Sequence, residues 1–176
     1  MKKIIIIGCP GSGKSTFARK LSDITNIPLY HLDMIWHKPD KTTLTKEEFD
    51  EQLRDLLQKS EWIIDGNYQR TLEVRIKECD TIFLLDIPLQ TCLESVRARI
   101  GKKRNDLPWL EKELDEDFEK WIYSYPDKSL PKIYELLEKY ADNKRIYIFK
   151  SRSEIDSYLK SLVNWIRIYE NGAEVY

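Results

Sequence analysis

Continuous apolar runs alternate along this chain with segments in which apolar residues recur every three or four positions. Runs such as 4–7 and 82–85 are typical of strands that are buried on both faces of a parallel sheet. Strands are expected in five places, each bounded by polar or turn-forming residues: 4–7, 28–33, 62–66, 81–86 and 145–149.

The periodic segments between these strands predict helices, because an apolar stripe at helical spacing packs against a sheet. The helices are expected at 13–25, 45–57, 72–76, 89–100, 110–125, 133–140 and 151–163. Pro126 and Pro131 are expected to bracket a turn, and 34–43 is expected to be a loop.

Strands that are separated by helices imply right-handed crossovers and a parallel sheet. We therefore expect one domain over residues 1–176, a three-layer α/β fold with a five-stranded parallel sheet and helices on both faces. No apolar stretch is long enough to span a membrane.

The turn after the first strand has the spacing G-x-x-x-x-G-K-S of a phosphate-binding loop. Its glycines let backbone N–H groups converge on an anion, and the helix that follows adds the positive end of its dipole. Lys14 is expected to reach the β- and γ-phosphates of a nucleoside triphosphate, and the Ser15 hydroxyl is expected to bind Mg²⁺. The expected nucleotide-binding residues are Gly8, Pro10, Gly11, Ser12, Gly13, Lys14, Ser15 and Thr16.

Composition narrows the function further. The chain has 29 basic and 30 acidic residues, which argues against a general nucleic-acid coat but leaves a local basic patch at 102–104 open. Three scattered cysteines suit a reducing compartment rather than a disulfide framework, and the apolar run at 4–7 is too short for a signal peptide. A cytoplasmic protein is therefore expected.

The phosphate loop, together with the stretches 62–71 and 83–88, resembles the nucleoside-monophosphate-kinase branch of P-loop proteins, which includes adenylate and shikimate kinases. Residues 31–36, 65–68 and 117–126 are most similar to bacterial adenylate-kinase-related kinases described as DNA topology modulation proteins. The resemblance covers roughly residues 1 to 160 and implies the sheet order 2-3-1-4-5, ATP as the phosphoryl donor and a mobile lid, about 97–125, after the fourth strand.

One departure from this family concerns the acceptor side, about 33–60. The stretch 34–44 is too short for the nucleotide-binding subdomain of adenylate kinase and has no arginine to hold a monophosphate. Residues 31–39 are instead similar to the carboxylate-aromatic-Lys-Pro stretch of uridine and nicotinamide-riboside kinases. The resemblance implies that Asp33 accepts the proton of the acceptor hydroxyl or orients that hydroxyl. The alternative is that Asp33 is only a surface carboxylate at the end of a strand.

The remaining candidates have competing interpretations. Asp65 could hold a Mg²⁺-bound water or form the turn before Gly66. Trp36 could stack on the acceptor or belong to the core, and Arg70 could bind an acceptor anion or be a surface charge.

Three arginines after the fourth strand are candidates for meeting the transferring phosphoryl group, and Arg97 and Arg104 are preferred over Arg99. Arg152 follows the fifth strand and could cover the adenine. The expected catalytic residues are thus Lys14, Asp33, Arg97 and Arg104.

We expect a small-molecule, nucleoside or nucleotide kinase that uses ATP and Mg²⁺ and has an unidentified small-molecule acceptor. A nucleotide-dependent regulatory or DNA-associated protein, and an ATPase without an acceptor, remain alternatives. The sequence leaves the choice between a monomer and a homodimer open.

Overall fold

The computed structural model describes residues 1–170 of the chain. At its centre is a parallel sheet of five strands in the order β2-β3-β1-β4-β5, as expected. The strands are β1 (Lys3–Gly8), β2 (Leu29–His31), β3 (Trp62–Asp65), β4 (Thr81–Leu85) and β5 (Arg145–Phe149).

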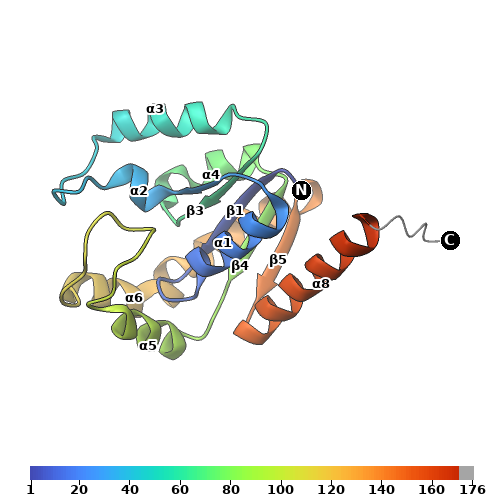
Figure 1. The fold of residues 1–176 in the computed structure, drawn as a ribbon. Helices are drawn as coiled ribbons and strands as arrows, with labels where there is room; N and C mark the ends of the chain where they lie inside the picture. Colours follow the sequence, from blue (N-terminus) through green and yellow to red (C-terminus); the bar gives the residue numbers. More distant parts are fainter. Residues whose placement is uncertain (171–176) are drawn as a thin grey trace.

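Helices cover both faces of this sheet, so the expected three layers are present (Figure 1). In Figure 1, α1 and α8 lie in front of the sheet and α4 lies behind it. The helices are α1 (Lys14–Thr25), α2 (Leu32–Trp36), α3 (Lys46–Leu57), α4 (Gln69–Glu78), α5 (Leu89–Arg99), α6 (Glu116–Lys128), α7 (Leu130–Lys139) and α8 (Arg152–Glu170), with a short 3₁₀ turn at Ala141–Asn143.

The core is built around the central strand. Ile4, Ile5, Ile6 and Ile7 are all completely buried, because β1 has neighbouring strands on both sides and helices on both faces. Burying each such side chain is worth about 1.5–3 kcal/mol. A continuous run of isoleucines therefore fixes β1 in the middle of the sheet and places the phosphate loop at its carboxyl end.

The segment after α5 differs from the expectation. The helix expected at 110–125 begins only at Glu116, because Asp115 caps it by accepting a hydrogen bond from the Phe118 amide at 2.7 Å. The loop there thus covers 100–115 rather than 102–106. Among the periodic apolar residues, Leu110 lies in this loop and is exposed.

Two further local expectations are corrected. Pro126 lies inside α6 and Pro131 lies in the first turn of α7, so the break falls between them at Ser129. The segment expected to be a loop at 34–43 begins with most of the short helix α2, which puts Asp33 in a helical first turn rather than at the end of a strand. Among the described residues, no helix has the length and apolar character needed to cross a bilayer.

Candidate active site

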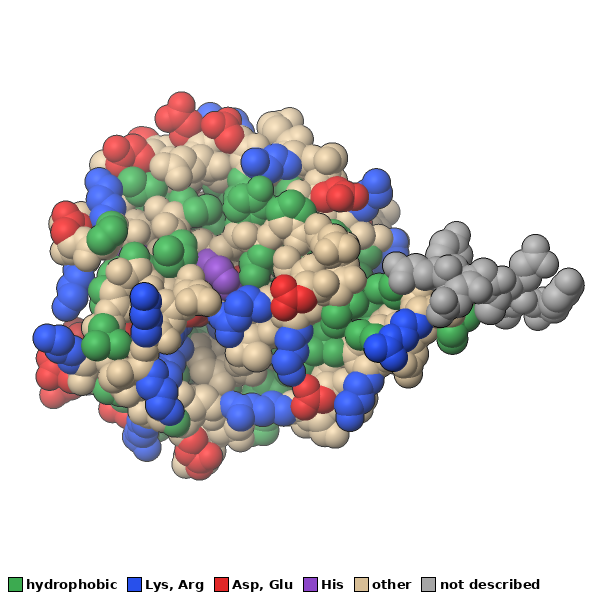
Figure 2. Space-filling model, viewed as in Figure 1, with side chains coloured by type: hydrophobic (Ala, Val, Ile, Leu, Met, Phe, Trp, Pro, Cys, Tyr) green, Lys and Arg blue, Asp and Glu red, His purple; other side chains and the backbone are tan. Residues whose placement is uncertain are grey.

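A cleft of about 1490 Å³ opens at the carboxyl ends of the strands. Its lining comes from the phosphate loop and the start of α1, from the segments after β2 and β3, from the loop 100–115 with its flanking residues, and from the first turns of α8. In Figure 2, Lys and Arg side chains surround a hollow in the front face, and a histidine lies beside it. This position is where parallel α/β sheets generally bind ligands.

The phosphate loop is held in shape by glycines. Gly11 and Gly13 have φ angles of 81° and 99°, which side-chain-bearing residues rarely adopt. A Cβ at Gly11 would also lie 2.2 Å from the Cys92 carbonyl oxygen. Lys14 begins α1 and donates a hydrogen bond from Nζ to the Cys9 carbonyl at 3.0 Å, so its ammonium group turns back over the loop.

The sequence analysis missed Asn67, which holds the phosphate loop, and Arg75, which holds the turn that carries Asn67. Asn67 binds both backbone groups of Gly8: its Oδ1 accepts from the Gly8 amide at 3.0 Å and its Nδ2 donates to the Gly8 carbonyl at 2.8 Å. Arg75 is completely buried and donates to the carbonyls of Gly66, Asn67 and Tyr68 at 2.8, 2.5 and 3.2 Å.

Arg75 could have been found from the helical pattern. It lies on the same face of α4 as the buried Leu72 and Ile76, and an arginine on an apolar face needs buried partners. Burial lowers its pKa to about 10. The three carbonyls accept hydrogen bonds from Nη1 and Nη2, whereas the buried Nε has no hydrogen-bond partner. Asn67 carries no comparable signal, because a polar residue after a strand is usually an ordinary turn residue.

Asp65 ends β3 and is buried in the cleft. Its Oδ2 lies 2.9 Å from Nδ1 of His31, while its Oδ1 has no hydrogen-bond partner. A buried carboxylate oxygen without a partner is costly unless a ligand or water satisfies it. This side chain therefore fits either a bound cation or a water held by one.

Asp33 also lines the cleft and is partly buried. The Tyr68 hydroxyl donates a hydrogen bond to its Oδ1 at 2.8 Å. Burial raises the pKa of Asp33 above its ordinary value, and the charge of Asp65 raises it too, although the Tyr68 hydrogen bond and the charge of Lys14 act in the opposite direction. A carboxylate with a raised pKa accepts protons more readily.

The three candidate arginines after β4 separate into two groups. Arg99 and Arg104 line the cleft, whereas Arg97 is exposed and pairs with Glu119 at 2.7 Å on α6. Their positions favour Arg99 over Arg97, contrary to the preference drawn from the sequence, and the catalytic role of either one stays a prediction. Residues two positions apart on a helix point about 200° apart, so only one of this pair faces the cleft.

Arg99 and Arg104 share a carboxylate partner in the cleft. Glu111 accepts a hydrogen bond from Nη1 of Arg104 at 2.6 Å and lies 3.3 Å from Nε of Arg99. Burial lowers the pKa of Arg99, and the neighbouring charge of Arg104 lowers it further. Arg104 also binds Asp106 with two hydrogen bonds of 3.0 and 2.7 Å.

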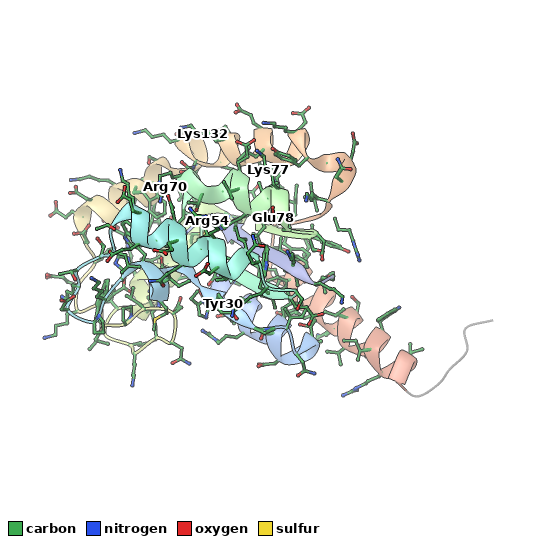
Figure 3. The ribbon with its side chains drawn as sticks, turned by 90° about the horizontal axis from the view of Figure 1, so that it is seen from above. Tyr30, Arg54, Arg70, Lys77, Glu78 and Lys132 are labelled. Carbon is green, nitrogen blue, oxygen red and sulfur yellow. The ribbon has the colours of Figure 1, made fainter. Side chains whose placement is uncertain are left out.

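Two expected acceptor-binding residues lie outside the cleft lining. Figure 3 shows Arg70 beside α3, where it forms a fork with Asp50 through two hydrogen bonds of 2.7 Å. Trp36 packs edge-on against Phe49 and Tyr68, which is the core alternative considered for it. These positions favour the alternatives considered for both residues, a surface charge for Arg70 and a core residue for Trp36, and an acceptor role of either one stays a prediction.

Arg152 lines the cleft and donates a hydrogen bond to the Ser95 hydroxyl. Its part in binding a nucleotide base stays a prediction. The sequence analysis did not single out Trp109. Its ring packs edge-on against the His37 ring, with centroids 4.8 Å apart, and so connects the loop 100–115 to the segment after β2.

The loop, the helix that follows it and the sheet order define a P-loop kinase fold. No family model matches the chain. A shikimate kinase from Aquifex aeolicus is 33% identical over 131 residues, which span 65% of this chain and 74% of that enzyme. The chain therefore belongs to the family of P-loop kinases that includes shikimate kinase.

Adenylate kinases are similar over a shorter region. The enzyme from Thermotoga maritima is 27% identical over 88 residues, and the match spans 49% of this chain and only 39% of that enzyme. Among solved structures, a shikimate kinase from Acinetobacter baumannii in complex with shikimate superimposes on this chain with a TM-score of 0.62, at 14% sequence identity. The superposition covers 99% of this chain and 96% of that enzyme. That likeness establishes the fold.

Proposed function

We propose that this protein is a small-molecule kinase that transfers the γ-phosphoryl group of ATP to a hydroxyl of its acceptor. The observation that carries the proposal is the position of the Asp33 carboxylate in the same cleft as Lys14 and the phosphate loop. Kinase relatives support the reaction class. The acceptor hydroxyl is proposed from the chemistry of Asp33.

On the donor side, the backbone amides of the loop and the positive end of the α1 dipole bind the phosphates. Lys14 neutralises charge that develops on the phosphoryl group during transfer. The residues available for Mg²⁺ fit it, because Asp65 has a buried oxygen without a partner, and Ser15, in the first turn of α1, lines the same cleft. Bound there, Mg²⁺ would neutralise charge on the phosphates.

On the acceptor side, Asp33 accepts the proton of the hydroxyl or holds the hydroxyl for attack, and Tyr68 orients the carboxylate. Basic side chains also line the cleft, namely Lys41, Arg99, Lys103 and Lys112. Although Glu111, Glu113 and Asp115 line the cleft as well, these cations offer partners to an acceptor that carries an anionic group as well as a hydroxyl. Shikimate is a hydroxylated carboxylic acid and is therefore the first acceptor to test.

The test is a phosphorylation screen with ATP and Mg²⁺. It covers hydroxy acids including shikimate, sugars, nucleosides and nucleoside monophosphates, with the Lys14→Ala variant as the blank. We expect a hydroxyl-bearing acceptor to give a product that depends on Lys14 and Asp33. Transfer to a nucleoside monophosphate alone, at the same rate in wild type and Asp33→Asn, would contradict the proposed acceptor chemistry.

A further inference from the structure

Residues 66–68 connect β3 to α4 and reach both sides of the cleft. On the donor side, the Asn67 side chain bonds to the amide and the carbonyl of Gly8 in the phosphate loop, at 3.0 and 2.8 Å. On the acceptor side, the Tyr68 hydroxyl donates a hydrogen bond to the Asp33 carboxylate at 2.8 Å. Two adjacent residues therefore hold one group from each half of the proposed reaction.

The backbone of this connection is strained at Tyr68. Its φ of 30° and ψ of 68° are left-handed, a conformation that a residue with a bulky side chain rarely adopts. Such a conformation costs free energy and persists only where the surrounding structure holds it. The Tyr68 ring stacks on Phe49 with centroids 5.2 Å apart, and the Tyr68 carbonyl accepts a hydrogen bond from the Thr71 amide at 3.0 Å. The carbonyls of the two preceding residues are held by a different side chain.

That side chain is Arg75 of α4, which is completely buried. Its guanidinium donates to the carbonyls of Gly66, Asn67 and Tyr68 at 2.8, 2.5 and 3.2 Å. A planar guanidinium presents its donors in a fixed fork, so it ties three consecutive carbonyls in one relative orientation. Arg75 is not among the residues that line the cleft, so any effect on the substrates passes through the residues that it holds.

We propose that Arg75 is a positioning residue for both sides of the cleft. It holds residues 66–68 in their strained conformation, and Asn67 then stays on the phosphate loop while Tyr68 stays on Asp33. The loop and the acceptor-side carboxylate thus keep a fixed relative position. The inference rests on the proposed function, and it explains why a buried cation lies on the apolar face of α4.

The competing role for Arg75 is structural only, namely a buried side chain that stabilises the fold. The two roles give different results in Arg75→Met, which is apolar and of similar length. Because a buried charge is costly to desolvate, its replacement by an apolar side chain of similar volume is often neutral or stabilising. A positioning role predicts that the variant keeps its melting temperature and loses catalysis. A structural role predicts that both fall together or that neither does.

The experiment measures two quantities for each variant. Calorimetry gives the affinity for a non-hydrolysable ATP analogue, and single-turnover transfer is followed at saturating ATP with the acceptor that the screen finds. For Arg75→Met we expect the affinity to fall about 3–10-fold, the usual weight of one hydrogen bond, and transfer to fall on the order of 10²-fold. Arg75→Lys restores a buried donor and should recover part of both losses. Arg54→Met, on the exposed end of α3, is the matched control and should keep wild-type values.

Two double-mutant cycles identify the partners. In an Asn67→Ala background, Arg75→Met should cause no further loss of affinity for the ATP analogue, because the contact with Gly8 that it supports is already gone. In a Tyr68→Phe background, Arg75→Met should lower transfer less than it does in wild type, because the hydrogen bond to Asp33 is already gone. A structural role would instead give independent effects in both cycles.

Wild-type affinity and transfer in Arg75→Met overturn the proposal, and so do independent effects in the two cycles. A loss confined to one of the two quantities would contradict a role on both sides. If Arg75→Met is unfolded, Arg75→Lys takes its place in both cycles, and wild-type values there count against the proposal. If wild type binds the analogue but phosphorylates no acceptor, the proposed function fails together with the acceptor half of this inference. The cycle on affinity then still decides whether Arg75 positions the phosphate loop.

Discussion

The two sides of the cleft are constructed differently. The phosphate-binding side is made of consecutive backbone from β1 into α1, and its shape follows from glycines at fixed spacing. The acceptor side is assembled from side chains of α2, of the segment after β3 and of the loop 100–115. The first is a local structure, and the second exists only when distant segments meet.

This difference affects how each side tolerates change. Backbone groups cannot be removed by substitution, so the donor side depends on a few side chains such as Lys14. The acceptor side depends on pairs of side chains. The Tyr68 hydroxyl donates a hydrogen bond of 2.8 Å to Asp33, and the ring centroids of Trp109 and His37 lie 4.8 Å apart. We therefore expect variants of the donor side to lose all transfer, whereas acceptor-side variants should lose rate or selectivity in steps.

The largest effect is expected for Lys14→Ala. It removes the charge that meets the β- and γ-phosphates, so ATP affinity should weaken and transfer should fall by at least about 10³-fold. Calorimetry and single-turnover transfer measure the two effects. Lys46→Ala, on the exposed start of α3, should retain wild-type values. Unchanged affinity and turnover in a folded Lys14→Ala protein would refute the nucleotide site.

The next largest effect is expected for Asp33→Asn. It should keep ATP affinity and lose transfer by about 10²–10⁴-fold, the usual weight of general acid–base catalysis. Single-turnover transfer to the acceptor found by the screen measures it. Near-normal transfer would show that Asp33 has a structural role only.

Tyr68→Phe tests the same carboxylate through pH. If Asp33 is the proton acceptor, as proposed, transfer in wild type should decline as pH falls through its raised pKa, because the protonated carboxyl cannot take a proton. The Tyr68 hydrogen bond favours the charged carboxylate, so its removal should raise the pKa and move the acid limb of the kcat profile to higher pH. An acid limb at the wild-type position would contradict the assignment.

These expectations rest on a site of which the sequence revealed one side well. The glycine spacing and the four isoleucines are local signals, and they sufficed for the phosphate loop and the strand before it. The alternation of strands and helices indicated the parallel α/β fold, and the resemblance to P-loop kinases implied the sheet order. Asn67 was missed because its partner is a backbone group that only the folded turn presents. Arg75 did carry a signal, its position on the apolar face of α4, which was not used.

The errors on the other side have the same origin. The start of α6 was misplaced because its cap, Asp115, stands among acidic residues that look alike in sequence. The sequence could not distinguish Arg97 from Arg99, because the choice depends on which face of α5 meets the cleft. In the fold, Arg97 pairs with Glu119 of α6 and Arg99 lines the cleft. The sequence could not show that Asp50 holds Arg70, because the two residues lie on separate helices, α3 and α4, that meet only in the fold.

A smaller effect is expected from the two arginines of α5, Arg97 and Arg99. Arg99→Ala should lower kcat on the order of 10²-fold while leaving ATP affinity within a modest factor, because a cation in the cleft meets charge that develops during transfer. Arg97→Ala is the matched control, since its exposed pair with Glu119 contributes little. Steady-state kinetics measure both. The reverse order of effects would restore Arg97 as the catalytic candidate.

The smallest effect is expected for Arg70→Ala, which tests where the acceptor side ends. Arg70 is exposed and its guanidinium is held by Asp50, so it has no free donor pair directed into the cleft lining. We expect kcat and the acceptor KM to stay within about twofold, and a double-mutant cycle with Asp50→Ala to give a coupling free energy of about 0.2–1 kcal/mol in unfolding experiments. The cycle is needed because Asp50→Ala frees the guanidinium. A lower acceptor KM in Asp50→Ala, lost again in the double variant, would contradict this expectation. It would show that Arg70 binds the acceptor once Asp50 no longer holds its guanidinium, so that the acceptor side would include Arg70 of α4.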